Sequence, residues 1–159
     1  MATFYSNLVN RPSTALRDMN GTVAEWLQAL LLLVVIAVLN TAVSIAVRGG
    51  AVADEFLEAS VSAGVFSLLL AGSVWLVLAV ALGRFQSPLR VHAGAVLIMT
   101  PLVLGPVPVL GLLAVLATFL LVYPLVRQMA DVSGRAGIAL TLLVWAIIAV
   151  VALAYGRLA

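Results

Sequence analysis

The sequence predicts an all-α protein: a polytopic bundle of transmembrane helices with five spans, preceded by a short interfacial helix. Hydrophobic residues make up 65% of the 159 residues and charged residues only 9%, with a mean hydropathy of +1.26. An ordinary soluble domain is about 25% charged, so lipid is the expected solvent for most of this surface. Apolar stretches that match the roughly 20 residues of a membrane-spanning helix are separated by short segments with Arg, Gly or Pro.

The first of two expected regions, residues 1–22, has no long apolar run and is predicted to be a cytoplasmic or interfacial segment. Pro12 is typical of the first turn of a helix, and residues 12–19 would then lie on the membrane surface. In that arrangement Met19 faces lipid while Arg17 stays in water. The alternative is a frayed tail.

The second region, residues 23–159, is the expected transmembrane domain. Its spans are predicted at about residues 23–47, 56–82, 89–104, 109–126 and 136–154. The apolar stretch from residue 89 to residue 126 is too long for one crossing, and prolines interrupt helices because they lack the backbone donor and clash with the preceding turn. We therefore expect two short spans here, separated by a helix break at Pro101, Gly105, Pro106 and Pro108.

The arginines test the span count, because the cytoplasmic loops of a membrane protein hold most of its basic residues. Five spans place six of the eight arginines on the side of the N-terminus: Arg11, Arg17, Arg84, Arg90, Arg127 and Arg135. In a four-span alternative, the proline-rich stretch forms a re-entrant hairpin that does not cross the membrane. Five arginines then lie on one side of the membrane and three on the other. We therefore expect five spans, with the N-terminus in the cytoplasm and the C-terminus outside.

His92 is the only histidine and the one candidate cofactor-binding residue. A single imidazole can ligate a pigment magnesium or a haem iron, or move protons. The sequence has no Cys and no carboxylate deep in a span to complete such a site, so we favour an interfacial polar residue. Gly-rich phosphate loops, GxSxG and HExxH are also absent from the sequence. We therefore expect no enzyme, no catalytic residue, no cofactor and no metal.

Small residues recur along the second predicted span and favour close helix packing, since they let two helix backbones approach. The members of this row are Ala63, Gly64, Ser67, Ala71 and Gly72. We favour packing within the chain, and homodimerisation through this face is the alternative.

Several segments, in sequence order, resemble the Yip family of five-span membrane proteins, named for interaction with Ypt/Rab GTPases, and its prokaryotic members in particular. They are residues 8–17, residues 75–83 with the following Val91-His92-Ala93, the Thr100-Pro101 pair, and residues 123–136. The resemblance implies a cytoplasmic N-terminus, five spans in a prokaryotic cytoplasmic membrane, and a role in membrane organisation or trafficking. The cytosolic Tyr-Gly-Pro segment of eukaryotic members has no counterpart before the first span, so Rab binding is not carried over.

Three functions follow as hypotheses. The first is a noncatalytic Yip-like membrane protein that contacts lipids or partner proteins through its helix faces. The second is a small accessory subunit of a larger energy-transducing complex, respiratory or photosynthetic. The third is a small transporter, since broken helices often line binding sites in transporters. The expected partners are membrane lipids and either other membrane proteins or further copies of this chain, but not nucleic acid, because the arginines are isolated.

Overall fold

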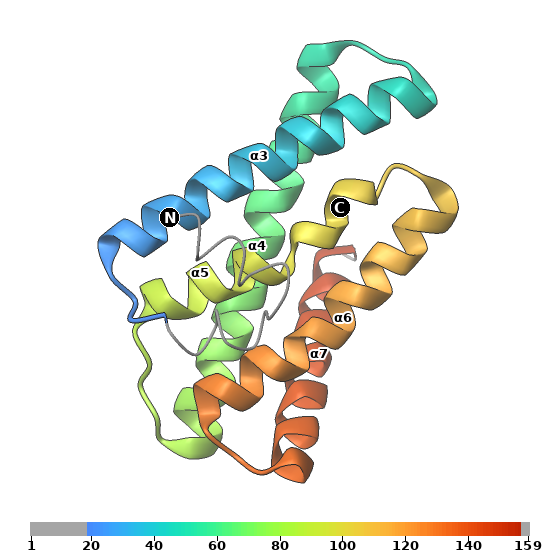
Figure 1. Cartoon of the computed structure of the whole chain (residues 1–159). Helices are drawn as coiled ribbons and strands as arrows, with labels where there is room; N and C mark the ends of the chain where they lie inside the picture. Colours follow the sequence, from blue (N-terminus) through green and yellow to red (C-terminus); the bar gives the residue numbers. More distant parts are fainter. Residues whose placement is uncertain (1–18, 157–159) are drawn as a thin grey trace.

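The computed structural model describes residues 19–156, and all regular secondary structure in this range is helical, which confirms the all-α prediction. The elements in chain order are α3 (Val23–Arg48), α4 (Val52–Leu82), α5 (Pro88–Ile98), the 3-10 helix η1 (Thr100–Leu104), α6 (Pro108–Ala130) and α7 (Gly134–Gly156) (Figure 1). Apart from Met19, the predicted interfacial helix at residues 12–19 lies outside the described residues.

Four of the described helices, α3, α4, α6 and α7, are long and apolar enough to cross a membrane, whereas Pro88–Leu104 forms a shorter apolar stretch. Large apolar side chains point outward from the long helices; Val80 is 77% exposed and Leu120 is 69% exposed. Such a surface suits lipid and not water. The described residues therefore have the helices and the surface of an integral membrane protein.

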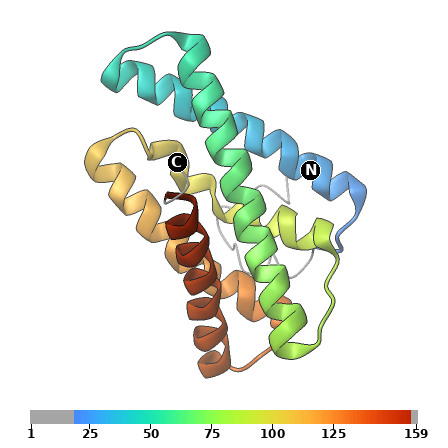
Figure 2. The same ribbon diagram turned by 180° about the vertical axis from the view of Figure 1, so that it is seen from behind.

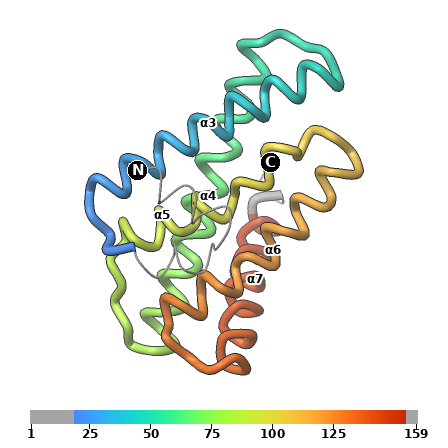
Figure 3. Tube along the Cα trace, in the orientation of Figure 1, coloured from blue at the N-terminus to red at the C-terminus, as the bar shows by residue number. Residues whose placement is uncertain are grey.

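The helices are arranged as two hairpins with a further helix beside them. Helices α3 and α4 form the first hairpin, and its closed end projects beyond the turn that joins η1 to α6 (Figure 3). The second hairpin consists of α5 with η1 and then α6. Helix α7 packs against both α6 and α4, as the view from behind shows (Figure 2).

Helix α5 lies in the centre of this arrangement. Every residue from 91 to 99 is buried, and α5 contacts α3, α4 and α6. A helix of 11 residues is about 16 Å long, which is far shorter than the roughly 30 Å of a hydrocarbon core. It is nevertheless shielded on all sides, because the longer helices around it face the lipid.

The break between α5 and α6 consists of η1 and a turn. Pro101 lies in the first turn of η1, and Pro106 lies in the connection to α6. Pro108 is the first residue of α6, where a backbone N–H has no partner within the helix, so the helix loses no hydrogen bond through the proline. The carbonyl oxygen of Leu102 accepts a hydrogen bond from Nδ2 of Asn40 on α3, at 2.9 Å. One backbone carbonyl group of the break is thus bound to the first hairpin.

Helix α6 continues beyond residue 126 to Ala130, because Pro124 is accommodated inside it and the left-handed Asp131 ends it (φ 51°). One local expectation requires correction. Met19 does not face lipid, since it is only 3% exposed and belongs to the core. The carboxylate of Glu25 accepts hydrogen bonds from the backbone N–H groups of residues 20–22, and the chain thereby turns Met19 inward before α3 begins.

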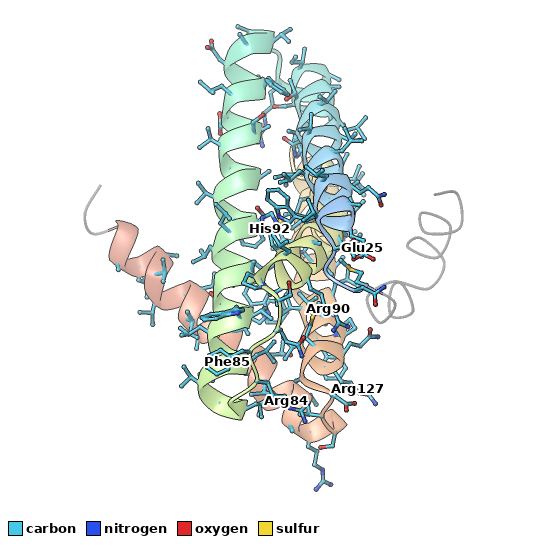
Figure 4. All side chains as sticks on the ribbon, turned by 90° about the vertical axis from the view of Figure 1, so that its left-hand side faces the viewer. Glu25, Arg84, Phe85, Arg90, His92 and Arg127 are labelled. Carbon is cyan, nitrogen blue, oxygen red and sulfur yellow. The ribbon has the colours of Figure 1, made fainter. Side chains whose placement is uncertain are left out.

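Three arginines of the two hairpins, Arg84, Arg90 and Arg127, lie at one end of the molecule (Figure 4), whereas Arg48 lies at the closed end of the first hairpin. Arg84, at the end of α4, donates a hydrogen bond to the carbonyl oxygen of Ala130 at the end of α6, and Nε2 of Gln86 donates to Met129 O at 3.0 Å. Figure 4 shows Arg84, Arg90 and Arg127 in the same half of the molecule. The exits of α4 and α6 and the entry of α5 therefore lie together.

The closest backbone approach in the second hairpin yields a stability prediction. A Cβ atom at Gly111 would collide with the carbonyl oxygen of Gly105. Replacing Gly111 by Ala should therefore lower stability by about 1–3 kcal/mol, the usual cost of overpacking. Gly72→Ala is the matched control: a Cβ atom there meets nothing within 4 Å, and Ala is the better helix former. Thermal unfolding of both variants in detergent checks this, and equal midpoints would contradict it.

Candidate functional site

His92 forms part of a hydrogen-bond chain that joins three helices. Nε1 of Trp26 on α3 donates to Nδ1 of His92 at 3.1 Å. Nε2 of His92 lies 3.3 Å from Oγ of Ser67 on α4, and that hydroxyl donates to the carbonyl oxygen of Gly64 at 2.8 Å. Because an indole N–H only donates, Nδ1 accepts and the ring proton is assigned to Nε2, which donates to Ser67.

The hydrogen bonds of His92 lie inside the protein. The side chain is 9% exposed and lies against α3 and α4, so it is a buried bridge between helices (Figure 4). The lone pair of Nδ1 accepts from Trp26 and the proton of Nε2 is directed at Ser67, so both ring nitrogens take part in bonds between helices. Within residues 19–156 no group of three or more His, Cys, Asp or Glu side chains is placed to hold a metal ion.

The row of small residues on α4 divides into three groups by surroundings. Ser67 and Ala71 are buried against the rest of the chain. Ala63 lines a groove described below. Gly64 and Gly72 border open space, since a Cβ atom at either position meets nothing within 4 Å. Packing within the chain therefore uses only part of the row.

A groove of about 520 Å³ lies between the two hairpins. Helices α3 and α4 form one wall, η1 and α6 form the other, and α7 contributes Trp145. Two residues of the predicted break, Gly105 and Pro106, line the second wall. The break thus takes part in shaping a cavity of the size that small-molecule sites have.

Polarity changes steadily along the first wall of the groove. The residues that α3 contributes, from the closed end of the hairpin inward, are Arg48, Ser44, Asn40, Ala37 and Ile36. Those from α4, in the same direction, are Glu55, Glu58, Ala59, Ser62, Ala63 and Phe66. Charged groups therefore lie at one end, neutral polar groups follow, and apolar side chains occupy the other end.

The apolar end is closed by aromatic and aliphatic side chains. Phe119 of α6 stacks on Trp145 of α7 with ring centroids 4.5 Å apart and planes 17° from parallel. Met99 and Val115 complete this end together with Phe66. These side chains offer an alkyl chain a surface as apolar as lipid.

At the charged end of the groove, one carboxylate is held by a hydrogen bond, and two other charged side chains have no ion-pair partner among the described residues. Oγ of Ser44 donates to Oε2 of Glu55 at 2.5 Å. The other carboxylate oxygen lies over Gly50, whose φ of 125° is a backbone conformation that favours glycine. Arg48 and Glu58 are exposed, and neither forms an ion pair with any described residue. Both can therefore bind a polar group that enters the groove.

Asn40, Ser44 and Ser62 line the groove, although sequence reasoning did not assemble them into a site. The four-residue spacing of Asn40, Ser44 and Arg48 is the signal that places them on one helix face. What the spacing does not reveal is that this face is opposite Glu55 and Glu58.

Comparisons of the chain with protein-family models, with curated proteins and with solved structures return no match. The interpretation of the groove therefore rests on the residues that line it.

The hydrogen-bond chain through His92 yields a coupling prediction. His92→Leu and Trp26→Phe should each destabilise the protein, and the double variant should be less destabilised than the sum because both substitutions remove the same bond. The coupling energy should be about 1 kcal/mol, as for hydrogen bonds between membrane helices. Unfolding equilibria of the unchanged protein, the two single variants and the double variant in detergent measure this coupling energy. If the losses of stability in the single variants simply add up in the double variant, the bond contributes nothing to stability.

Proposed function

We propose that the chain is a five-span integral membrane protein that acts without catalysis by holding a membrane lipid in the groove between its two hairpins. The observation that carries this proposal is the match between the groove and one leaflet of a bilayer. From Glu55 to Phe66 helix α4 rises about 16 Å, close to half of the roughly 30 Å hydrocarbon core. Over that distance the lining changes from charged to apolar, as a lipid does from headgroup to chain end.

Five crossings are the topology that best accounts for the arrangement of the chain. The stretch Pro88–Leu104 is too short to span a bilayer unaided, but its residues 91–99 are buried among longer helices and therefore need no contact with lipid. It enters at the end where α4 and α6 finish, and η1 leaves it near the opposite end. In this topology the arginine-rich end is cytoplasmic, and the charged end of the groove faces the outer leaflet.

A lipid-holding role is compatible with the function that the Yip resemblance implies, the organisation of membranes without catalysis. Membership of that family is part of the proposal, and its support is the order of sequence segments described above. Binding to partner proteins would use the outward faces of α3, α4, α6 and α7.

The topology can be tested by labelling, because the sequence has no cysteine and single cysteines can be introduced without background. With five spans, Ser133→Cys, between α6 and α7, should react with an impermeant maleimide from the same side as Ser87→Cys, between α4 and α5. Ala51→Cys, between α3 and α4, should react from the other side. If Ser133→Cys reacts together with Ala51→Cys, the chain crosses four times and the proposal is wrong.

Lipid retention tests the groove itself. Ala63 lines the groove, whereas Ala81 lies exposed on the same helix and away from it. Ala63→Phe should fill part of the cavity and displace the lipid that remains bound to the protein after mild extraction. Ala81→Phe adds the same ring on the lipid-facing surface and should leave retention unchanged. Native mass spectrometry counts the bound lipids, and equal retention in both variants would refute the lipid-holding role.

A further inference from the structure

We infer that the groove selects a phospholipid whose headgroup carries both a primary ammonium and a phosphate, that is, the phosphoethanolamine type. This inference rests on the proposed lipid-holding function and assigns the chemistry of its ligand. It depends on three charged side chains that line one end of the same cavity, Arg48, Glu55 and Glu58.

The signs of these charges match a zwitterion. The two carboxylates and one guanidinium give this end of the groove a formal charge of −1, so a lipid with a purely anionic head would be repelled on balance. A zwitterionic head brings a cation to the carboxylates and an anion to the guanidinium. Charge-assisted hydrogen bonds of both kinds are about twice as strong as neutral ones, and Arg is well suited to phosphate.

The charged side chains at this end of the groove can form further hydrogen bonds and ion pairs, which also favours this headgroup. Glu58 and Arg48 have no ion-pair partner among the described residues, although both line the cavity. Glu55 is held by Ser44 through one oxygen, which fixes the direction of its carboxylate. The site therefore offers a carboxylate in a set position, a second carboxylate beside it on the same helix face, and a guanidinium on the facing helix.

The placement of aromatic residues distinguishes a primary ammonium from a quaternary one. Quaternary ammonium groups are typically recognised by aromatic cages, through cation–π contacts. The aromatic side chains of this groove, Phe66, Phe119 and Trp145, lie at the apolar end, and the charged end has none. A primary ammonium, with three N–H donors, instead fits two carboxylates.

The length of the groove favours a lipid over a small amphiphilic amine. Arg48 and Ile36 are separated by three turns of α3, about 18 Å, and every turn between them contributes a lining residue. A headgroup at Arg48 would thus leave an acyl chain running past Asn40 to the Phe119 and Trp145 rings. A short amine would leave most of this apolar lining uncovered.

The test is competitive retention from an equimolar mixture of phosphoethanolamine, phosphocholine and phosphoglycerol lipids with identical acyl chains. The purified full chain is reconstituted with the mixture, and native mass spectrometry identifies the lipid that stays bound. We expect the phosphoethanolamine lipid to be enriched roughly tenfold over the other two, the effect of one or two charge-assisted hydrogen bonds. Glu58→Gln and Arg48→Gln should each abolish most of this enrichment.

Asp54→Asn is the matched control. Asp54 lies in the first turn of α4 but does not line the groove, so the same loss of one negative charge should leave the enrichment intact. Glu58, Arg48 and Asp54 are all exposed, so the variants are expected to fold, which size-exclusion chromatography verifies.

The outcomes separate the headgroup assignment from the lipid-holding role. Enrichment of the phosphoglycerol lipid, or equal retention of all three, would overturn the assignment, and so would enrichment that survives both Glu58→Gln and Arg48→Gln. If Ala63→Phe still displaces the bound lipid in those cases, the groove holds lipid without selecting its head. If Ala63→Phe displaces nothing, the groove is not the binding site and both proposals fail.

Discussion

The burial of helix α5 is the constraint on which the rest of the structure depends. This helix has only 11 residues, and its continuation η1 is a 3-10 helix followed by a proline-containing turn. A helix this short cannot span the hydrocarbon core by itself, so protein and not lipid must surround it. Helices α3, α4 and α6 surround α5, and no residue from 91 to 99 is exposed. The 3-10 helix η1 has no buried residue but contacts α3 and α6.

The hydrogen-bond chain through His92 fixes α5 among its neighbours. Trp26 and Ser67 approach the imidazole from α3 and α4, so one side chain of α5 sets the positions of two helices relative to it. Arg84 and Gln86 bind the end of α6 in a similar way, through its terminal carbonyl groups. The contacts of His92, Arg84 and Gln86 thus join segments that are far apart in the sequence.

The groove is a consequence of unequal helix lengths. Helix α4 has 31 residues, whereas Pro88–Leu104 is much shorter, so the first hairpin extends beyond the turn between η1 and α6 (Figure 1). Nothing in the described part of the chain fills the space beside the projecting part, and the faces of α3 and α4 that border it bear Arg48, Ser44 and Glu55. A short central helix therefore both requires a protein environment and leaves room for a ligand.

The sequence predicts the helices better than the contacts between them. Hydropathy and length identify α3, α4, α6 and α7, because lipid imposes the same requirement on every spanning helix. The role of His92 could not be predicted, since its partner Trp26 is 66 residues away and no spacing rule connects them. The inward position of Met19 likewise depends on the Glu25 capping contacts, and the groove depends on which faces of two helices oppose each other. Such features arise from tertiary packing, which local patterns do not encode.

The most direct measurement of the central claim is labelling with a lipid-soluble photoreactive carbene precursor in a bilayer, followed by peptide mapping. If α5 is shielded as described, residues 91–98 should remain unlabelled while outward positions such as Val80, Leu120 and Leu153 react. Labelling of α5 at a level similar to those positions would show that the short helix contacts lipid, and the account of the fold and of the groove would then be contradicted.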